Sequence, residues 1–147
     1  MAHGDGRSET PPAGANFGDW TAEFGYSAGA RIATEQGITA VFAANDQIAI
    51  GLLSALHQAG RRVPDDISVV GFDNQPETTY LIPPLTTIGQ DFPAVGRRAV
   101  DTLTRAISGS PASEENLIAP ELVIRFSTST PRPMSDPLAS AVSASPI

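Results

Sequence analysis

The stretch from Ile67 to Phe92, ISVVGFDNQPETTYLIPPLTTIGQDF, constrains the fold more than any other part of the chain. It starts with Ile67 to Phe72, a run that is unbroken by polar residues except Ser68 and that lies between acidic, turn-forming neighbours. Such a short run predicts a β-strand covered on both faces, as in the parallel sheet of an α/β protein. Asp73 would then lie at the carboxyl end of the strand, where open α/β sheets bind ligands.

Asp73 allows two interpretations on the residues alone. As a ligand contact, its carboxylate would face the crevice beyond the strand ends. As a cap, Asp73 and Asn74 would hold a turn by accepting hydrogen bonds from backbone N–H groups. The spacing does not decide between them.

Two further units precede this stretch. Ile38 to Ala44 predicts a strand, Asn45 is a suitable N-cap, and the amphipathic residues from Ile48 to Gly60 predict a helix. Earlier, the residues from Trp20 to Gln36 favour a helix, with Asp19 or Thr21 able to cap it. Small residues recur four apart on one face of that helix, which we expect to lie close to a sheet: Gly25, Gly29 and Ala33. Trp20 is the only tryptophan, and a tryptophan at a helix entrance is more often a core anchor than a ligand platform.

The segment after the central strand is bounded by prolines and carries three large apolar residues in a row, which need a cover: Tyr80, Leu81 and Ile82. Thr86 to Gly89 predicts a strand, and a helix should follow from Phe92 to Ser108. Four apolar residues define one face of that helix: Val95, Ala99, Leu103 and Ile107.

The C-terminal part predicts two short strands, Leu117 to Ala119 and Leu122 to Phe126, on either side of Pro120. From Ser127 onward serine, proline and alanine dominate, which predicts disorder. We therefore divide the chain into a flexible tail or linker at 1–17, a folded unit at 18–128 and a disordered tail at 129–147.

Charge and composition exclude several kinds of protein. The 147 residues carry a net charge of −7 and nine scattered arginines without a lysine, so this chain alone should not bind DNA. The absence of cysteine and the presence of only His3 and His57 exclude disulfide frameworks and make a metal site an unexpected feature. No apolar run has the length of a membrane span, and Met1 to Phe17 does not resemble a signal peptide, so a cytoplasmic location is the default.

Several motifs in a fixed order resemble the effector-binding domain of lactose-repressor-type (LacI/GalR) transcription regulators. They are GDWTAEFGYSAG at 18–29, AVFAANDQIAIGLLSALHQAG at 40–60, VPDDISVVGFDN at 63–74, PPLTTIGQDF at 83–92 and ELVIRFST at 121–128. The resemblance implies an α/β fold, part of a type I periplasmic-binding-protein-like domain. It also implies that the first lobe and the helix-turn-helix head lie outside this chain.

The resemblance implies a set of site residues. In regulators of this family the matching positions contact the effector: Trp20, Asn45, Asp73, Gln90 and Phe92. An aromatic side chain can stack on the apolar face of a sugar ring, and the Asn45 amide can both donate to and accept from a hydroxyl. Four apolar positions match the family's subunit interface, unless they fold back on their own lobe: Ile50, Tyr80, Leu81 and Ile82.

The resemblance favours an effector-sensing part of a repressor, which would bind a sugar or a similar polar molecule and form a homodimer. It would meet operator DNA only through the absent head, with no cofactor, no membrane partner and no catalytic activity. One alternative is a solute-binding protein of a sugar transport system. A less favoured alternative is an enzyme with Asp73 and Asp91 as a glycosidase pair. The chain has no glycine-rich phosphate loop and no GxSxG elbow to support catalysis.

The helix at 92–108 should belong to the first lobe in such a regulator. Its apolar face would then lack a partner within this chain, and the sheet would keep an unpaired edge. We therefore expect the chain on its own to associate or to be only marginally stable.

Overall fold

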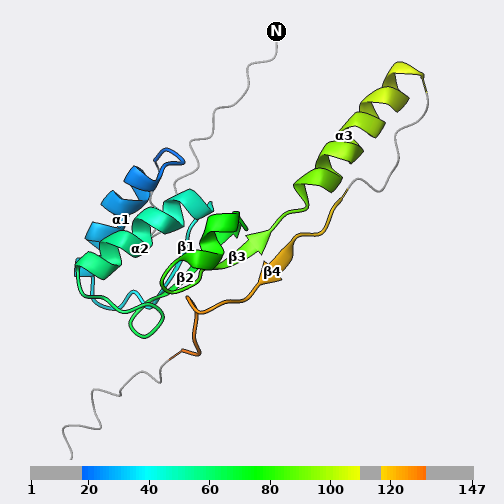
Figure 1. The fold of residues 1–147 in the computed structure, drawn as a ribbon. Helices are drawn as coiled ribbons and strands as arrows, with labels where there is room; N and C mark the ends of the chain where they lie inside the picture. The colour runs from blue at the N-terminus through cyan, green and yellow to red at the C-terminus, as the bar shows by residue number, and fades with distance from the viewer. Residues whose placement is uncertain (1–17, 110–116, 132–147) are drawn as a thin grey trace, which may run out of the picture.

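The computed structural model describes residues 18–109 and 117–131. Its elements, in chain order, are α1 (Ala22–Thr34), β1 (Ala40–Phe42), α2 (Asp46–Gln58), β2 (Ser68–Asp73), the 3-10 helix η1 (Pro76–Tyr80), β3 (Thr86–Gly89), α3 (Phe92–Ile107) and β4 (Glu121–Val123). Strands alternate with helices, and Figure 1 shows α1 and α2 lying beside a small sheet. The α/β class predicted from the sequence is confirmed.

The four strands form one sheet in the order β1-β2-β3-β4. The first three strands are parallel, with Val70 opposite Thr86 and Asp73 opposite Gly89. The last strand is antiparallel and pairs Val123 with Thr87. Because β1, β2 and β3 run in the same direction, their carboxyl ends meet at one edge of the sheet.

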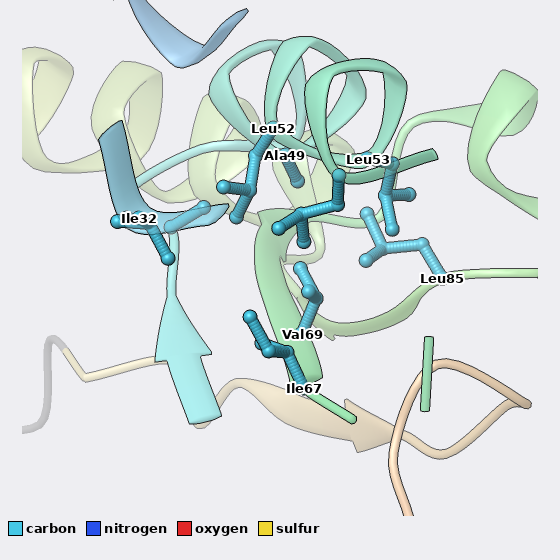
Figure 2. Packing of buried hydrophobic residues seen from close by; sticks show 9 residues of the cluster. Ile32, Ala49, Leu52, Leu53, Ile67, Val69 and Leu85 are labelled. Atoms are coloured by element: carbon cyan, nitrogen blue, oxygen red, sulfur yellow. The ribbon is translucent and has the colours of Figure 1, made fainter. Parts of the chain in front are cut away.

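The hydrophobic core lies between the two helices and one face of the sheet. Figure 2 shows Leu52 and Leu53 extending from α2 on the side that faces the sheet, with Leu53 directed toward Leu85. The buried cluster consists of Ile32, Ala43, Ala49, Leu52, Leu53, Leu56, Ile67, Val69 and Leu85. The helix α2 thus covers the inner face of the central strand, and α1 packs mainly on α2.

The prediction that the central strand is covered on both faces is wrong. Along β2 the buried residues alternate with half-buried ones, so that Val69 and Gly71 are buried while Ser68 and Val70 are not. On the neighbouring strand, Phe42 is 60% exposed. An apolar run alone does not distinguish a strand covered twice from one whose second face is open.

The small residues of α1 serve a different contact from the one predicted. A β-carbon at Gly25 would overlap the backbone of Ile48, and one at Gly29 would lie 2.8 Å from the β-carbon of Ala55. Both partners belong to α2, so the glycines allow two helices to approach each other and not a helix to approach the sheet. The cap predicted for this helix is confirmed, since the Thr21 side chain accepts from the backbone N–H of Phe24.

The helix α3 stands apart from this core. It begins at Phe92, its N-cap Asp91 accepts a hydrogen bond from Ala94 N, and none of its residues is buried. Its apolar face is open to solvent, with Leu103 62% and Ile107 79% exposed. Figure 1 shows α3 projecting away from α1 and α2, and the prediction that this face has no cover within the chain holds for the described residues.

The C-terminal predictions are only partly right. The only strand in this part of the described chain is β4, so Leu117 to Ala119 is not a strand and Leu122 to Phe126 is one only at its start. The partner strand β3 ends at Gly89, which lies opposite Glu121. The residues before Glu121 therefore have no residue of β3 to pair with. Leu117 is consequently 98% exposed.

Disorder from Ser127 onward is also contradicted at its start. Ser127 is fully buried, and its hydroxyl accepts from Thr86 N at 2.7 Å and donates to Val69 O at 2.6 Å. Ser129 N donates to the Ser68 hydroxyl at 3.2 Å. Amino-acid composition does not distinguish a serine whose hydroxyl joins two strands from a serine in a disordered tail. The predicted tail at 1–17 lies outside the described residues, as does the predicted tail at 129–147 from residue 132 onward.

Candidate functional site

Three polar side chains follow the carboxyl ends of three neighbouring strands. Asn45 comes just after β1, Asp73 ends β2, and Gln90 follows β3. Because these strands are adjacent and parallel, the three residues lie along one edge of the sheet. This edge is where open α/β sheets bind ligands.

The two aromatic candidates flank the same edge. The Trp20 carbonyl accepts a hydrogen bond from Asn45 Nδ2 at 3.1 Å, and the Phe92 N–H donates to the Gln90 carbonyl at 3.0 Å. Their side chains are open to solvent, Trp20 at 67% and Phe92 at 53% exposed. Trp20 is therefore not the core anchor that the residues alone favoured. The five residues predicted as effector contacts therefore lie at or beside the carboxyl ends of the three parallel strands.

Asp73 is the half-buried acid at the centre of this edge. Gln90 Nε2 donates to its Oδ1 at 3.3 Å, which ties the end of β2 to the start of the α3 segment. Burial raises the pKa of the Asp73 carboxyl, the Gln90 hydrogen bond lowers it, and the nearby Asp46 charge raises it, so that the net direction is upward. The carboxyl group is thus held at the site partly desolvated.

The cap interpretation of Asp73 does not hold in the structure. The next two backbone N–H groups have other acceptors: Asn74 N donates to Thr87 Oγ1 at 3.3 Å, and Gln75 N donates to Asp46 Oδ2 at 2.8 Å. The side chain of Asp73 is therefore not needed to hold its own turn.

Asn45, in contrast, is a helix cap. Its Oδ1 accepts from Ile48 N at 2.8 Å, and one of its two amide protons is used by the Trp20 carbonyl. The amide keeps one N–H free of these two bonds, because an asparagine side chain carries two donors. A ligand hydroxyl could accept from that proton without breaking the cap.

Two residues near this edge were missed from the sequence. Asp46 is fully buried and accepts from Thr87 Oγ1 at 2.7 Å. Arg125 donates to Asn74 Oδ1 and to Leu85 O, each at 2.7 Å, and so holds the segment after Asp73 from its other side. The one available signal for Arg125 was a basic residue inside the apolar run VIRF, and Asp46 had none beyond its helix-starting position.

The predicted interface residues differ in exposure. Tyr80 is 84% and Ile82 is 95% exposed, whereas Leu81 packs partly against the core and Ile50 is half-buried. The alternative of folding back therefore applies to Leu81. Tyr80 and Ile82 remain open apolar surface within the described chain.

A hollow also lies away from this edge. A cavity of about 730 Å³ runs between α1, β1 and α2, and its walls are mostly apolar, including Phe24, Ile32 and Phe42. None of the five predicted contacts lines it. It lacks the converging polar groups that fix a small polar ligand.

No helix in the described ranges has the length and apolar character needed to cross a membrane.

An open, mainly parallel sheet with polar and aromatic side chains at its carboxyl edge is typical of ligand-binding α/β domains. The family model described as a periplasmic binding protein-like domain matches residues 7–128, and the chain belongs to this family. Within the family its relatives are regulators of the lactose-repressor type, which confirms the resemblance found in the sequence motifs.

Curated relatives carry names of transcription regulators. The chain is 38% identical over 126 residues to the lactose operon repressor of Escherichia coli, a match to 85% of this chain and 35% of the repressor. It is 45% identical over 112 residues to the transcriptional repressor PurR of Mannheimia succiniciproducens, covering 75% of this chain and 34% of that protein. The chain thus spans about a third of the length of these relatives.

Solved structures agree with the fold. A lac repressor dimer bound to operator and the anti-inducer ONPF superposes with a TM-score of 0.70 at 40% identity, over 76% of this chain and 39% of that one. A LacI family regulator from Arthrobacter in complex with lactose gives 0.66 at 38% identity, over 74% and 42%. A regulator from Enterococcus faecium with bound ribose gives 0.68 at 33% identity, over 76% and 42%. The partial periplasmic-binding-protein-like fold is therefore confirmed.

Proposed function

We propose that this chain is part of the effector-sensing domain of a lactose-repressor-type regulator and that it binds a sugar or a similar polyhydroxylated molecule at the carboxyl edge of the sheet. The observation that carries this proposal is Asp73, which is partly desolvated, bonded to Gln90 and not used to hold its own turn. We take residues 18–128 as the extent of this ligand-binding unit.

Each candidate contact offers a distinct interaction. The Asp73 carboxylate can accept from two hydroxyls, and the remaining Asn45 N–H can donate to one. Trp20 offers an exposed ring on which the apolar face of a sugar can stack, and Phe92 offers a second apolar wall. Gln90 can keep its bond to Asp73 while its amide oxygen accepts from the ligand.

Effector binding would act by shifting a conformational equilibrium. A ligand changes the affinity for a second partner only when it binds one conformation better than another. The bond between Asp73 of β2 and Gln90, which leads into α3, joins the two parts of the chain that such a shift would move. Relatives in complex with lactose and with ribose support a sugar as the effector class.

The partners of the regulator follow by the same analogy. The lac repressor structure is a dimer bound to operator, and we propose a homodimer here with Tyr80 and Ile82 as contacts, because both are exposed apolar side chains. Contact with operator DNA would be made by a helix-turn-helix head and not by these acidic residues. We place the regulator in the cytoplasm, where a repressor meets its operator.

The two alternatives are less well supported. The relatives are named as transcription regulators, which favours a sensor over a transport protein. A glycosidase pair requires two available carboxyl groups, but Asp91 is the N-cap of α3 and accepts from Ala94 N at 2.8 Å. We propose a non-catalytic site without a cofactor.

The proposal can be tested with the protein expressed from its complete native gene. Thermal-shift assays with lactose, ribose and a set of nucleosides should show stabilisation by a sugar. Asp73→Ala should remove it, because each charge-assisted hydrogen bond to a hydroxyl contributes about 1.5–3 kcal/mol. Glu77→Ala removes an exposed carboxylate of η1 and serves as the control. An unchanged sugar response in Asp73→Ala would contradict the proposed site.

A further inference from the structure

Asp46 is a fully buried carboxyl group that no ligand contact accounts for. It is the first residue of α2 and lies next to the cap Asn45. Burying a charged group without partners is strongly unfavourable, so such a group persists only when hydrogen bonds satisfy it. Both of its oxygens are in fact bonded.

The partners of Asp46 form a ring of hydrogen bonds with the backbone after Asp73. Thr87 Oγ1 donates to Asp46 Oδ1 at 2.7 Å and accepts from Asn74 N at 3.3 Å. Gln75 N donates to Asp46 Oδ2 at 2.8 Å. The two backbone N–H groups that follow Asp73 are thus both tied to Asp46, one directly and one through the Thr87 hydroxyl.

This ring surrounds a stretch of backbone in an uncommon conformation. Asp73 has φ of +111° and Asn74 has φ of +54°, a region that side chains with a β-carbon rarely adopt. Such a conformation persists when the surrounding contacts determine it. The direction in which the Asp73 carboxylate leaves the strand depends on this backbone, so the ring sets where that carboxylate points.

The surroundings of Asp46 are shaped around its carboxyl group. Gly71 lies against it, and a β-carbon at that position would overlap Asp46 Oδ1 and approach Leu85 Cδ2 at 2.8 Å. The start of α2 also favours a negative charge, because the first N–H groups of a helix point toward it. In addition, Gln47 Nε2 donates to Gln75 Oε1 at 2.8 Å, a second link between the start of α2 and the same turn.

We propose that Asp46 and Thr87 are positioning residues that fix the Asp73 turn for effector binding. This inference rests on the function proposed above. Neither residue touches the ligand, since Asp46 and Thr87 are both fully buried. They act by holding Asp73 in the one orientation that faces the edge of the sheet.

The neighbouring threonine gives a matched control. Thr86 and Thr87 are both buried on β3, and both hydroxyls are hydrogen-bonded. The Thr86 hydroxyl bonds Thr128 Oγ1 and Arg125 N on the β4 side, whereas the Thr87 hydroxyl bonds Asp46 and the Asp73 turn. Replacing either by valine removes one hydroxyl from the same strand without changing the size of the side chain.

The experiment compares the wild type with Thr87→Val, Thr87→Ser, Asp46→Asn and Thr86→Val in the protein expressed from its complete native gene. Amide hydrogen exchange at Asn74 and Gln75 is measured without ligand, and titration calorimetry measures binding of lactose and of ribose. We expect faster exchange in Thr87→Val and Asp46→Asn, and a loss of affinity of roughly ten- to a hundredfold, as when the groups that orient metal ligands are removed. Thr87→Ser should restore both, and Thr86→Val should change both much less than Thr87→Val does, because the Thr86 hydroxyl reaches the turn only through Arg125.

Hydrogen exchange and calorimetry together distinguish a failure of the hydrogen-bond ring from a failure of the proposed function. Equal exchange in Thr87→Val and Thr86→Val would overturn the ring as the cause of the turn. Changed exchange with equal sugar affinity in these two variants would overturn its part in binding. If the wild type binds neither sugar while exchange changes as expected, the ring stands and the proposed function fails for these sugars.

Discussion

The body of the domain, formed by α1, α2 and β1 to β3, differs sharply from its arm, formed by α3 and β4. In the body the apolar faces meet, and Leu52, Leu56 and Val69 lose nearly all contact with water. In the arm the apolar face of α3 is as regular, yet none of its residues is buried. The same amphipathic pattern therefore supports a core in one region and an open surface in the other.

The difference shows which regions hold their own structure. A helix draws most of its stability in proteins from packing of its apolar face and not from local propensity. The body has that packing, whereas the supports seen for α3 are its cap Asp91 and local pairs such as Arg105 with Asp101. The site lies where the two regions join, with Asp73 in the body and Gln90 leading into the arm.

Matched leucine substitutions should give the largest contrast. Leu56→Ala, at a fully buried position of α2, should lower the free energy of unfolding by about 2–5 kcal/mol. Leu103→Ala, on the exposed face of α3, should change it by less than about 0.5 kcal/mol. Urea denaturation of the purified chain measures both. Similar losses for the two variants would show that the arm is packed in solution, for instance against another copy.

Two glycine-to-alanine substitutions should change the free energy of unfolding in opposite directions. A β-carbon at Gly51 would overlap the backbone of Ala22 and crowd Tyr26 N at 2.6 Å, so Gly51→Ala should cost about 1–3 kcal/mol or more. At Gly96 in α3 a β-carbon would meet nothing within 4 Å, and Gly96→Ala should stabilise the helix by about 0.5–1 kcal/mol. Circular dichroism during thermal unfolding distinguishes them. A destabilising Gly96→Ala would mean that α3 has a close neighbour.

Ionisation of Asp73 should give a smaller, pH-dependent effect at the junction. Because its pKa is raised in the folded chain, the folded state binds more protons than the unfolded state between the ordinary aspartate pKa of about 3.9 and the raised value. Its contribution to stability should therefore fall as pH rises through that window. The difference between wild type and Asp73→Asn in urea denaturation across pH measures it, and a difference of the opposite sign would contradict the burial of this group.

The same carboxyl group should make sugar binding depend on pH. Affinity should weaken as pH falls through the Asp73 pKa, because a protonated carboxyl accepts fewer hydrogen bonds from hydroxyls. Titration calorimetry of lactose or ribose with the wild type and with Asp73→Asn measures this. If the sugar affinity of the wild type depended on pH as little as that of the variant, Asp73 would not be a ligand contact.

The smallest effect should come from the surface of the arm. Arg105 Nε bonds Asp101 Oδ2 at 3.1 Å, and both side chains are about half exposed. Asp101→Asn should cost about 0.3–0.5 kcal/mol, the usual value for such a pair on a helix. Since this pair is one of few local supports of α3, the loss should appear in the helix signal and not in the melting of the body. A large loss of overall stability would indicate that the arm and the body unfold together.

Much of the fold was predictable because the local signals agree. Asn45 and Gly60 delimit α2, and the apolar runs before Asn45 and Asp73 give β1 and β2. The order of the motifs indicated the family and, through it, the residues at the strand ends. Their placement at one edge follows from parallel pairing, which a strand-to-helix alternation predicts.

The parts that could not be predicted depend on tertiary contacts. Whether Gly25 faces a sheet or a helix, and whether Ser127 is buried or in a tail, is decided by neighbours distant in the sequence. Asp46 had the appearance of an ordinary acid at a helix start, and only the folded chain shows its bond to Thr87, 41 residues away. The small length of β3 likewise limits how many residues of the C-terminal segment can pair with it as a strand.

One measurement tests the proposed site most directly. The protein expressed from its complete native gene is labelled with ¹⁵N and titrated with the sugar that stabilises it. We expect the largest amide shifts at Asn45, Asp73 and Gln90, together with a shift of the Trp20 indole N–H. Shifts confined to the walls of the apolar cavity, such as Phe24 and Ile32, or spread without a centre at the strand ends, would contradict it.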